Sequence, residues 1–406
     1  MSRSSNTRRD LAARPVPHLA PWLLLLALQP CAAALAATTA AAATAATTTN
    51  GTAAPAMPET HCDSPEERAN LARYTEFAAT VLNGADPARA AGFYAPQFTW
   101  HDAPERMPAG AAPMQRLQAA WRAAYPDAKV GTVFVLCAGD LLLAKQQLTG
   151  TNTGPLLGRA PTGRPLQAWH TETYRYADGR LVAQWGENPF KIASRAAGWT
   201  LAWPGDLPPG TPLPASLALR SMLPNAPDAA PGAPAHLGHP TLLRCDGEGP
   251  LLASYYDLFD NLWLSRRVDE IDRWVDPQFS LPMLPPGAAR GPQLLAGFVK
   301  GVQAAFPKRH LFNDVVLCAD GIVAARQTVL AINDGPFLGK PPTHRVTLVT
   351  WTDTYRFRNG RVYETYAADG DTIDTARQLG WVLLPPGESR PPTAPIEWLD
   401  VYPAAP

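Results

Sequence analysis

Hydrophobic positions follow a helical spacing near residue 70 and change to a strand-like spacing after residue 125. Within Pro65–Asn83 the apolar side chains recur three or four residues apart, which predicts an amphipathic helix. Ser64 is a suitable N-cap for it, with proline at the first helical position and Glu67 three residues after the cap. Shorter elements are expected next: helices over Pro87–Tyr94 and Pro113–Ala124, and a strand over Gln97–His101.

From residue 130 onward apolar and polar side chains alternate, which is the period of a β-strand. The turn Ala177-Asp178-Gly179 is a strong hairpin signal. Helices followed by a meander of long strands indicate an α+β fold. The expected strands are Val130–Cys137, Leu141–Thr149, Pro165–Tyr176 and Leu181–Trp185.

The second half of the chain repeats the first. Residues 124–188 align without a gap with residues 305–369, and 22 of the 65 pairs are identical. This offset of 181 residues is far longer than the period of about 20–50 residues found in solenoid repeats. We interpret it as a duplicated domain. The best-matching loop, Gly154–Arg164, resembles a phosphate cradle, but it joins two strands and opens no helix, so we interpret it as a structural hairpin.

Composition separates the two copies from low-complexity segments. A signal peptide is predicted by the arginines at the start of the chain, the short apolar run over Leu19–Leu28 and the cleavage-site-like sequence Ala34-Leu35-Ala36. The apolar run is too short to span a membrane as a helix. A twin-arginine signal at Arg8-Arg9 and a lipoprotein cysteine at Cys31 remain alternatives. The expected organisation is a signal peptide over 1–36, an Ala/Thr-rich tether over 37–58, domain one over 59–203, a Pro-rich linker over 204–240, domain two over 241–386 and a Pro-rich tail over 387–406.

Charge excludes one class of partner. The 406 residues carry 35 basic and 35 acidic side chains, and no basic stripe of the kind that binds nucleic acid is present in the sequence. We therefore expect no nucleic-acid partner. From the short apolar run we expect no membrane span, and from the predicted signal peptide we expect a periplasmic or secreted protein.

Four cysteines follow the predicted signal peptide, and they obey the duplication. Cys137 and Cys318 are equivalent, and Cys62 and Cys245 are nearly so, giving each copy one early and one central cysteine. In an oxidising compartment this predicts the disulfides Cys62–Cys137 and Cys245–Cys318. Four buried free thiols are the alternative. A zinc site is not expected, because the sequence has no C-x-x-C and no paired histidine spacing.

Several short motifs stand out along the first copy, and the second copy keeps some of them. They are Tyr94–Asp102, Ala124–Asp127, Ala138–Asp140, Gly150–Gly154, Pro161–Arg164 and Tyr174–Trp185, then Ala305–Pro307, Gly335–Arg345, Tyr355–Tyr366 and Ala376–Trp381. Together they resemble the SnoaL-like polyketide cyclase family, which shares the cone-shaped fold of nuclear transport factor two and ketosteroid isomerase. The resemblance implies two tandem cone-shaped α+β barrel domains, each a curved antiparallel sheet wrapped on helices around a pocket.

The resemblance also implies acid/base chemistry without a metal or other cofactor. Family cyclases close a ring by an aldol reaction, with a histidine on the strand before the last hairpin and an aspartate just after the tryptophan of the final strand. This chain departs from that pattern. The histidine position holds Glu172 or Asp353, and Trp185 is followed by Gly186.

Strand parity sorts the long strand of each copy into two faces. His170, Glu172 and Tyr174 share the face expected to line the cone, and there the copies differ except at the tyrosine. The other face carries Thr171 and Thr173, and it is nearly identical in the two copies. We expect this outer face to join the copies as an intramolecular pseudo-dimer. Alternatively, its threonines reflect only strand propensity on a solvated face.

The candidate site centres on a carboxyl that both copies keep. Burial among aromatic rings would raise the pKa of Glu172 and suit it to acid/base work, whereas pocket lining and a structural role are the alternatives. His101 and Asp102 match the family's polar pocket motif, although a surface or core role is open for the histidine. The expected pocket residues are Tyr74, His170, Tyr174 and Trp185 in copy one, with Asp353, Tyr355, Tyr366 and Asp369 in copy two.

Two functions follow from these residues. The first is binding of a small, largely apolar molecule in one or both cones by an exported protein. The second is a cyclase- or isomerase-type enzyme in which Glu172 or His101 carries the proton.

Overall fold

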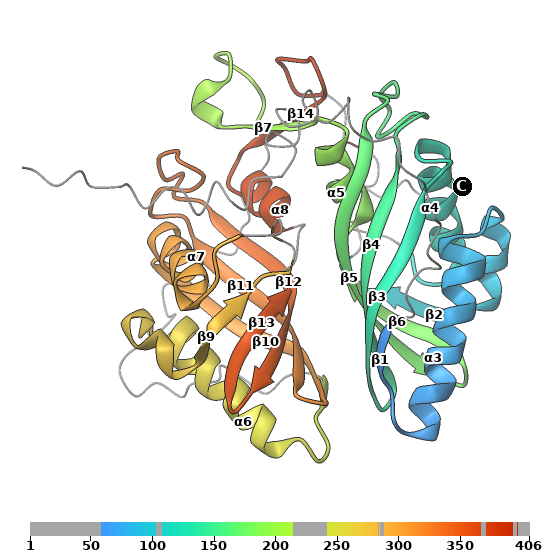
Figure 1. Cartoon of the computed structure of the whole chain (residues 1–406). Helices are drawn as coiled ribbons and strands as arrows, with labels where there is room; N and C mark the ends of the chain where they lie inside the picture. The colour runs from blue at the N-terminus through green and yellow to red at the C-terminus, as the bar shows by residue number, and fades with distance from the viewer. Residues whose placement is uncertain are drawn as a thin grey trace, which may run out of the picture.

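The chain forms two α+β domains that lie side by side, with their sheets facing each other and their long helices outside (Figure 1). This computed structural model describes residues 58–102, 108–213, 242–282, 284, 288–366, 371–392 and 396. The expected signal peptide, nearly all of the tether and most of the linker and tail lie outside these residues. No helix in the described part of the chain is long and apolar enough to cross a membrane.

Domain one begins with the predicted helix. The Ser64 hydroxyl accepts the Glu67 amide, and the Glu67 carboxylate accepts the Ser64 amide, which forms a complete capping box. A π-helical turn over Ala78–Leu82 extends this helix, and a 3-10 helix covers Pro87–Gly92. The elements are β1 (Glu59–His61), α3 (Pro65–Phe77), β2 (Tyr94–Trp100), α4 (Ala111–Ala124), β3 (Lys129–Ala138), β4 (Leu141–Thr151), β5 (Pro165–Ala177), β6 (Arg180–Gly186), α5 (Pro189–Ala196) and β7 (Thr200–Ala202).

Domain two repeats this order. A π-helical turn over Phe259–Leu264 and a 3-10 helix over Val268–Arg273 stand where their counterparts stand in domain one. Another 3-10 turn, Pro204–Asp206, follows β7. The elements are β8 (Leu242–Arg244), α6 (Gly249–Leu258), β9 (Val275–Ser280), α7 (Pro292–Ala305), β10 (Lys308–Ala319), β11 (Ile322–Ile332), β12 (Val346–Arg358), β13 (Arg361–Tyr366), α8 (Asp371–Gln378) and β14 (Val382–Leu384).

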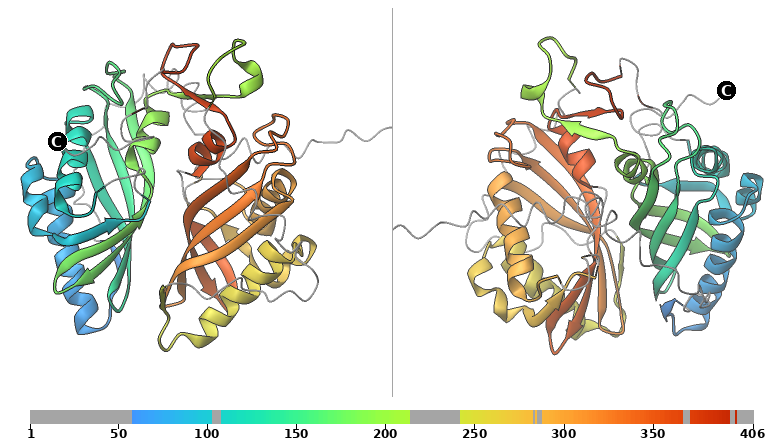
Figure 2. Two further views of the ribbon diagram at one scale, coloured as in Figure 1. Left: turned by 180° about the vertical axis from the view of Figure 1, so that it is seen from behind. Right: turned by 45° about the horizontal axis from the view of Figure 1, so that its top comes forward.

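Each domain is built on a six-stranded mixed sheet. The strand orders are β1-β3-β4-β5-β6-β2 and β8-β10-β11-β12-β13-β9. The two edge strands run parallel to their neighbours, and the four long strands form an antiparallel meander. Helices α3 and α4 cover one face of the first sheet, and α6 and α7 cover the matching face of the second (Figure 2). The tandem cone-shaped α+β fold expected from the sequence is thereby confirmed.

Two disulfides fasten the first strand of each sheet to its neighbour. Cys62 bonds Cys137, and Cys245 bonds Cys318, which are the two predicted pairs. In each pair the first cysteine directly follows β1 or β8, and the second lies within β3 or β10. The bridges therefore hold short parallel edge strands that have only three paired residues each.

The loop that is most alike in the two copies is structural. The Asn152 side chain bridges the Ala124 and Gly154 carbonyls and accepts from Thr162, and Asn333 repeats these bonds in domain two. A side chain at Gly154 would place Cβ 1.8 Å from the Ala123 carbonyl oxygen. Close packing on the end of a helix therefore explains why both copies keep the same sequence here.

The outer faces of the two sheets pack on each other. A cluster of buried side chains joins them: Phe134, Leu136, Ala138, Leu141, Leu143, Ala183 and Trp185 from domain one, with Val315, Leu317, Ile322, Ala324 and Tyr366 from domain two. Thr171, Thr173, Thr352 and Thr354 are buried on the same faces. The chain thus forms an intramolecular pseudo-dimer through the face on which its copies agree.

Polar contacts at the edge of this interface follow an approximate two-fold relation. The His61 imidazole contacts Asp320 at the β10–β11 turn, and Arg244 contacts Asp140 at the equivalent β3–β4 turn. Strands β7 and β14, one from each domain, pair antiparallel at the other end of the interface. Reciprocal contacts of this kind are typical of a self-complementary interface.

Candidate functional site

Domain one contains a cavity of about 50 Å³ between its sheet and its helices. Its apolar wall includes Phe77, Met114, Leu117 and Trp121. Its polar lining consists of Tyr94, Gln118, Gln146, His170, Glu172, Tyr174 and Gln184. Three of the residues predicted for the pocket, His170, Glu172 and Tyr174, therefore meet at this cavity.

A buried histidine and carboxyl form the polar centre of the cavity. The His170 Nε2 lies 2.9 Å from Glu172 Oε1 and 2.9 Å from the Glu187 carbonyl oxygen. Gln184 donates its side-chain amide to the second oxygen of Glu172 at 2.8 Å. Both side chains of the pair are almost fully buried, with 6% and 4% of their surface exposed.

Burial changes the acidity of this pair. Loss of hydration raises the pKa of the Glu172 carboxyl, although His170 and Gln184 oppose the shift. For His170, burial lowers the pKa, but the adjacent Glu172 carboxylate and the Glu187 carbonyl outweigh it and the pKa is raised. The pair therefore holds a proton at a pH where the separate, hydrated groups would release it.

Gly186 provides the space that the Glu172 side chain needs. A Cβ on Gly186 would lie 1.9 Å from Glu172 Oε2. Residues 172 and 186 are paired across β5 and β6, so the carboxyl lies directly over the glycine. A side chain after Trp185, such as the aspartate expected from the family resemblance, would therefore collide with the Glu172 carboxyl in its present position.

Tyr74, which was predicted for the pocket, bonds to the polar lining through Gln146 but is not one of the residues that line the cavity. The Tyr74 hydroxyl contacts Thr132 at 2.9 Å and accepts the Gln146 side-chain amide at 3.0 Å. The buried Tyr94 hydroxyl and Gln184 Oε1 have no hydrogen-bond partner among the described residues. Burial raises the pKa of Tyr94 and of Tyr174 well above that of a hydrated phenol, so both hydroxyls stay protonated.

Sequence reasoning did not select Tyr94, Gln146 or Gln184. One signal for Gln146 was available, because Gln327 matches it at the constant offset and donates to Tyr255 in the same way. Gln184 has no such signal, since Thr365 replaces it in domain two. Its importance depends on pairing with Tyr174 across β5 and β6.

Domain two keeps the carboxyl but changes its donor. Trp351 donates its indole N–H to Asp353 at 3.1 Å, and the Tyr355 hydroxyl donates to the same oxygen at 3.0 Å. The Tyr255 hydroxyl donates to Asn313 at 2.7 Å. The predicted residues Asp353 and Tyr355 therefore come together, but the indole that replaces His170 cannot exchange a proton with the carboxyl near neutral pH.

Four predicted site residues lie between the domains rather than in a cone. Trp185 and Tyr366 belong to the apolar cluster that joins the sheets, because their strand partners are Thr173 and Thr354 on the outer faces. His101 stacks on Trp185, with the rings 4.6 Å apart and parallel within 1°. Packing lowers the pKa of His101, and the Asp102 carboxylate opposes this shift.

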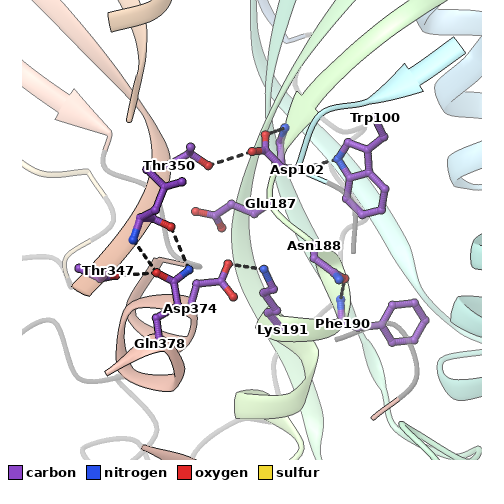
Figure 3. Close-up of polar contacts among 12 residues, drawn as sticks. Trp100, Asp102, Glu187, Asn188, Phe190, Lys191, Thr347, Thr350, Asp374 and Gln378 are labelled. Carbon is purple, nitrogen blue, oxygen red and sulfur yellow. Dashed lines mark hydrogen bonds and ion pairs between the residues drawn. The ribbon is translucent and has the colours of Figure 1, made fainter. Parts of the chain in front are cut away.

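Asp102 is the fourth of these residues. Its carboxylate accepts the Gly186 amide of its own domain at 2.9 Å, the Thr350 hydroxyl of domain two at 2.8 Å and the Arg326 guanidinium of domain two. Figure 3 shows it between the strands of the two domains. Asp369, the last predicted pocket residue, lies outside the described residues.

No group of three potential metal ligands occurs within the described ranges. The functional groups that the cavity presents are thus a titratable His–Glu pair, tyrosine hydroxyls and amides. These can bind a polar group or transfer a proton.

Comparison with known proteins agrees with the tandem fold. The profile of the SnoaL-like polyketide cyclase family matches residues 72–188 and again residues 253–379, together more than half of the chain. The chain belongs to the SnoaL-like polyketide cyclase family. Both matched segments contain the long meander of their domain and end near its last helix. No protein of curated function matches the sequence.

Solved structures similar to this SnoaL-like chain each correspond to about one of its domains. A SnoaL-like polyketide cyclase from Agrobacterium tumefaciens is 19% identical, with 32% of this chain and 98% of that chain covered and a TM-score of 0.28. TsrD from Streptomyces laurentii is 21% identical, with 32% and 96% covered and a TM-score of 0.29.

Proposed function

We propose that this tandem SnoaL-like protein binds a small, largely apolar molecule in the cone of domain one. The observation that carries the proposal is the cavity itself, which combines an apolar wall with the buried Tyr94 hydroxyl and the side-chain oxygen Oε1 of Gln184. A buried polar group without a partner is costly, so a ligand that bonds to these groups gains affinity. The ligand thus has an apolar body and one hydrogen-bonding group.

Size and charge restrict this ligand further. The cavity of about 50 Å³ is far smaller than the roughly 300–1,000 Å³ of pockets for drug-sized ligands. The Glu172 carboxyl disfavours an anion at the polar end. We therefore propose a neutral molecule of few non-hydrogen atoms.

Export to an oxidising compartment is part of the proposal. Its support is the pair of disulfides, one in each domain, together with the predicted signal peptide. In a periplasmic or secreted protein, the ligand would come from outside the cytoplasm.

The test is native mass spectrometry of protein purified from its exported compartment. We expect one small-molecule adduct per chain and a mass four hydrogens below the reduced form. Leu117→Phe, which copies Phe298 from the equivalent position of α7, fills the cavity and should remove the adduct. Leu348→Phe is the matched control, because Leu348 is exposed. An adduct that survives Leu117→Phe would contradict binding in this cavity.

A second candidate is an acid/base enzyme that uses the same cavity. The specific observation is the contact between His170 and Glu172, two groups with raised pKa that can share a proton. Glu172→Gln distinguishes the two functions once mass spectrometry has provided the ligand. Retained binding with loss of conversion supports the enzyme, whereas wild-type protein that returns the ligand unchanged supports binding alone.

A further inference from the structure

Asp102 connects domain two to the cavity of domain one. It follows β2 of domain one, yet two of the three residues that donate to its carboxylate lie on β11 and β12 of domain two. Arg326 donates to both of its oxygens, and Thr350 donates to one. A guanidinium that meets both oxygens of a carboxylate fixes its orientation as well as its charge.

Asp102 also holds the backbone beneath Glu172. It accepts the Gly186 amide, while the Gly186 carbonyl accepts the Trp100 indole N–H at 3.1 Å. Trp100 lines the cavity, and the Glu172 carboxyl lies against Gly186. A shift of Gly186 would therefore displace the carboxyl or the indole at the cavity wall.

Arg326 is well placed for this role because it is itself fixed. Its side chain is only 9% exposed, and Asp314 on β10 accepts from it as well. Thr328 donates to the same Asp314 carboxylate. The guanidinium thus lies between two carboxylates that face it from opposite domains.

The contact runs in one direction only. At the constant offset, Arg326 corresponds to Lys145 and Asp102 corresponds to Met283, so domain one cannot form the same ion pair with domain two. The domain that receives the contact is the one whose cavity has the titratable His–Glu pair. The copies have therefore diverged so that Arg326, which holds Asp102, lies in domain two, whereas the titratable pair lies in domain one.

We propose that Arg326 is a positioning residue for the cavity of domain one, acting through Asp102 and Gly186 on Glu172. The site of domain one is complete only when domain two is docked on it. This proposal uses the cavity of the proposed function, but its geometry can be tested without any ligand.

The test follows the His170 side chain by nuclear magnetic resonance in the full chain labelled with ¹⁵N-histidine. The signal is assigned with a His170→Gln variant, and its midpoint is measured by pH titration. In Arg326→Gln we expect the midpoint to fall toward the ordinary value of 6.5, because the contact with Glu172 loosens. We expect a fall of at least about half a pH unit.

The sign of the shift separates positioning from simple electrostatics. Removing a positive charge near Asp102 would by itself raise the midpoint, because it leaves Asp102, Glu172 and the nearby Glu187 less compensated. Arg326→Lys should restore part of the midpoint. Arg356→Gln is the matched control, since it removes another interdomain ion pair, with Glu59, that does not reach Gly186.

Thr350→Val provides a second variant that changes no charge. It removes one hydrogen bond to Asp102 and suits a β-strand, so it keeps the test available where Arg326→Gln does not fold. We expect a smaller fall of the same sign. A midpoint that is unchanged or raised in both variants overturns the proposal.

Ligand binding is read separately on the same proteins. If wild-type protein yields no adduct but the Arg326 variant lowers the His170 midpoint, positioning stands and the proposed function fails. If the adduct forms and the midpoint does not respond, the proposed function stands and positioning fails.

Discussion

The indole nitrogen of Trp351 lies 3.1 Å from the carboxylate of Asp353. His170 and Glu172 make the equivalent contact in domain one. The geometry of donor and acceptor is kept, but only the imidazole can gain or lose a proton near neutral pH. The two domains therefore share a framework and differ in whether its centre titrates.

The first prediction concerns pH. Both pKa values of the pair are raised above the ordinary 6.5 and 4.5, so the folded state binds protons more tightly than the unfolded state. The stability due to His170 is then fully present below pH 6.5 and is lost as the pH rises through its folded pKa. We expect the free energy of unfolding of domain one to fall as the pH rises above 6.5, as measured by urea denaturation across this range.

Glu172→Gln should reverse that slope. Without the carboxylate, burial, which is the largest influence on the pKa of His170, is opposed only by Glu187. We therefore expect the pKa to be lowered, so that the unfolded state binds the proton more tightly. Stability should then rise as the pH increases through the range near 6.5. A slope that is the same in both proteins would show that the pair does not control it.

The second prediction tests the space over Gly186. Gly186→Ala places a methyl group 1.9 Å from Glu172 Oε2 and should cost about 1–3 kcal/mol of stability. Gly131→Ala is the matched control, because its nearest neighbour would be 3.9 Å away. The measurement is urea denaturation of both variants. Combining Gly186→Ala with Glu172→Ala should recover much of the loss. Equal losses of stability in Gly186→Ala and Gly131→Ala would argue against the steric explanation.

The third prediction concerns the disulfides. Replacing Cys62 and Cys137 together by serine should lower the free energy of unfolding by about 2–5 kcal/mol, since the bridge closes a loop of 75 residues. The pair Cys245 and Cys318 closes a loop of 73 residues and should show a similar loss. Thermal unfolding of both double variants measures this. Wild-type stability in either variant would mean that its bridge contributes little.

The fourth prediction tests the interface. Leu143→Asp places a charge among the apolar side chains that join the two sheets, and we expect a loss of at least about 2 kcal/mol. The domains should separate, which small-angle X-ray scattering would detect as an increased radius of gyration. The exposed Leu348→Asp provides the comparison. An unchanged radius in Leu143→Asp would show that other contacts suffice to hold the domains.

The sequence predicted much of the fold because the duplication supplies two independent examples of each element. The strands, the disulfide pairs and the outer face of the long strand were read twice and agreed. Short elements such as β1, α5 and β7 were missed, because three to eight residues carry little periodicity. Their positions depend on contacts with the rest of the sheet.

The candidate site was predicted where strand parity alone decides it, as for His170, Glu172 and Tyr174. Trp185 differs, because the register of β6 against β5 decides its face and a single sequence does not reveal that register. The role of Asp102 could not be predicted either. Its partner Arg326 is 224 residues away in sequence, on a domain whose orientation follows only from packing.

The pairing of β7 with β14 has a consequence for how the two halves could diverge. Thr200–Ala202 and Val382–Leu384 are the closing strands of the two copies, and they pair with each other as identical subunits would across a symmetry axis. In a true homodimer every substitution appears on both sides of that axis. One continuous chain has no such constraint. Lys145 in one copy and Arg326 at the equivalent position of the other can therefore make different contacts.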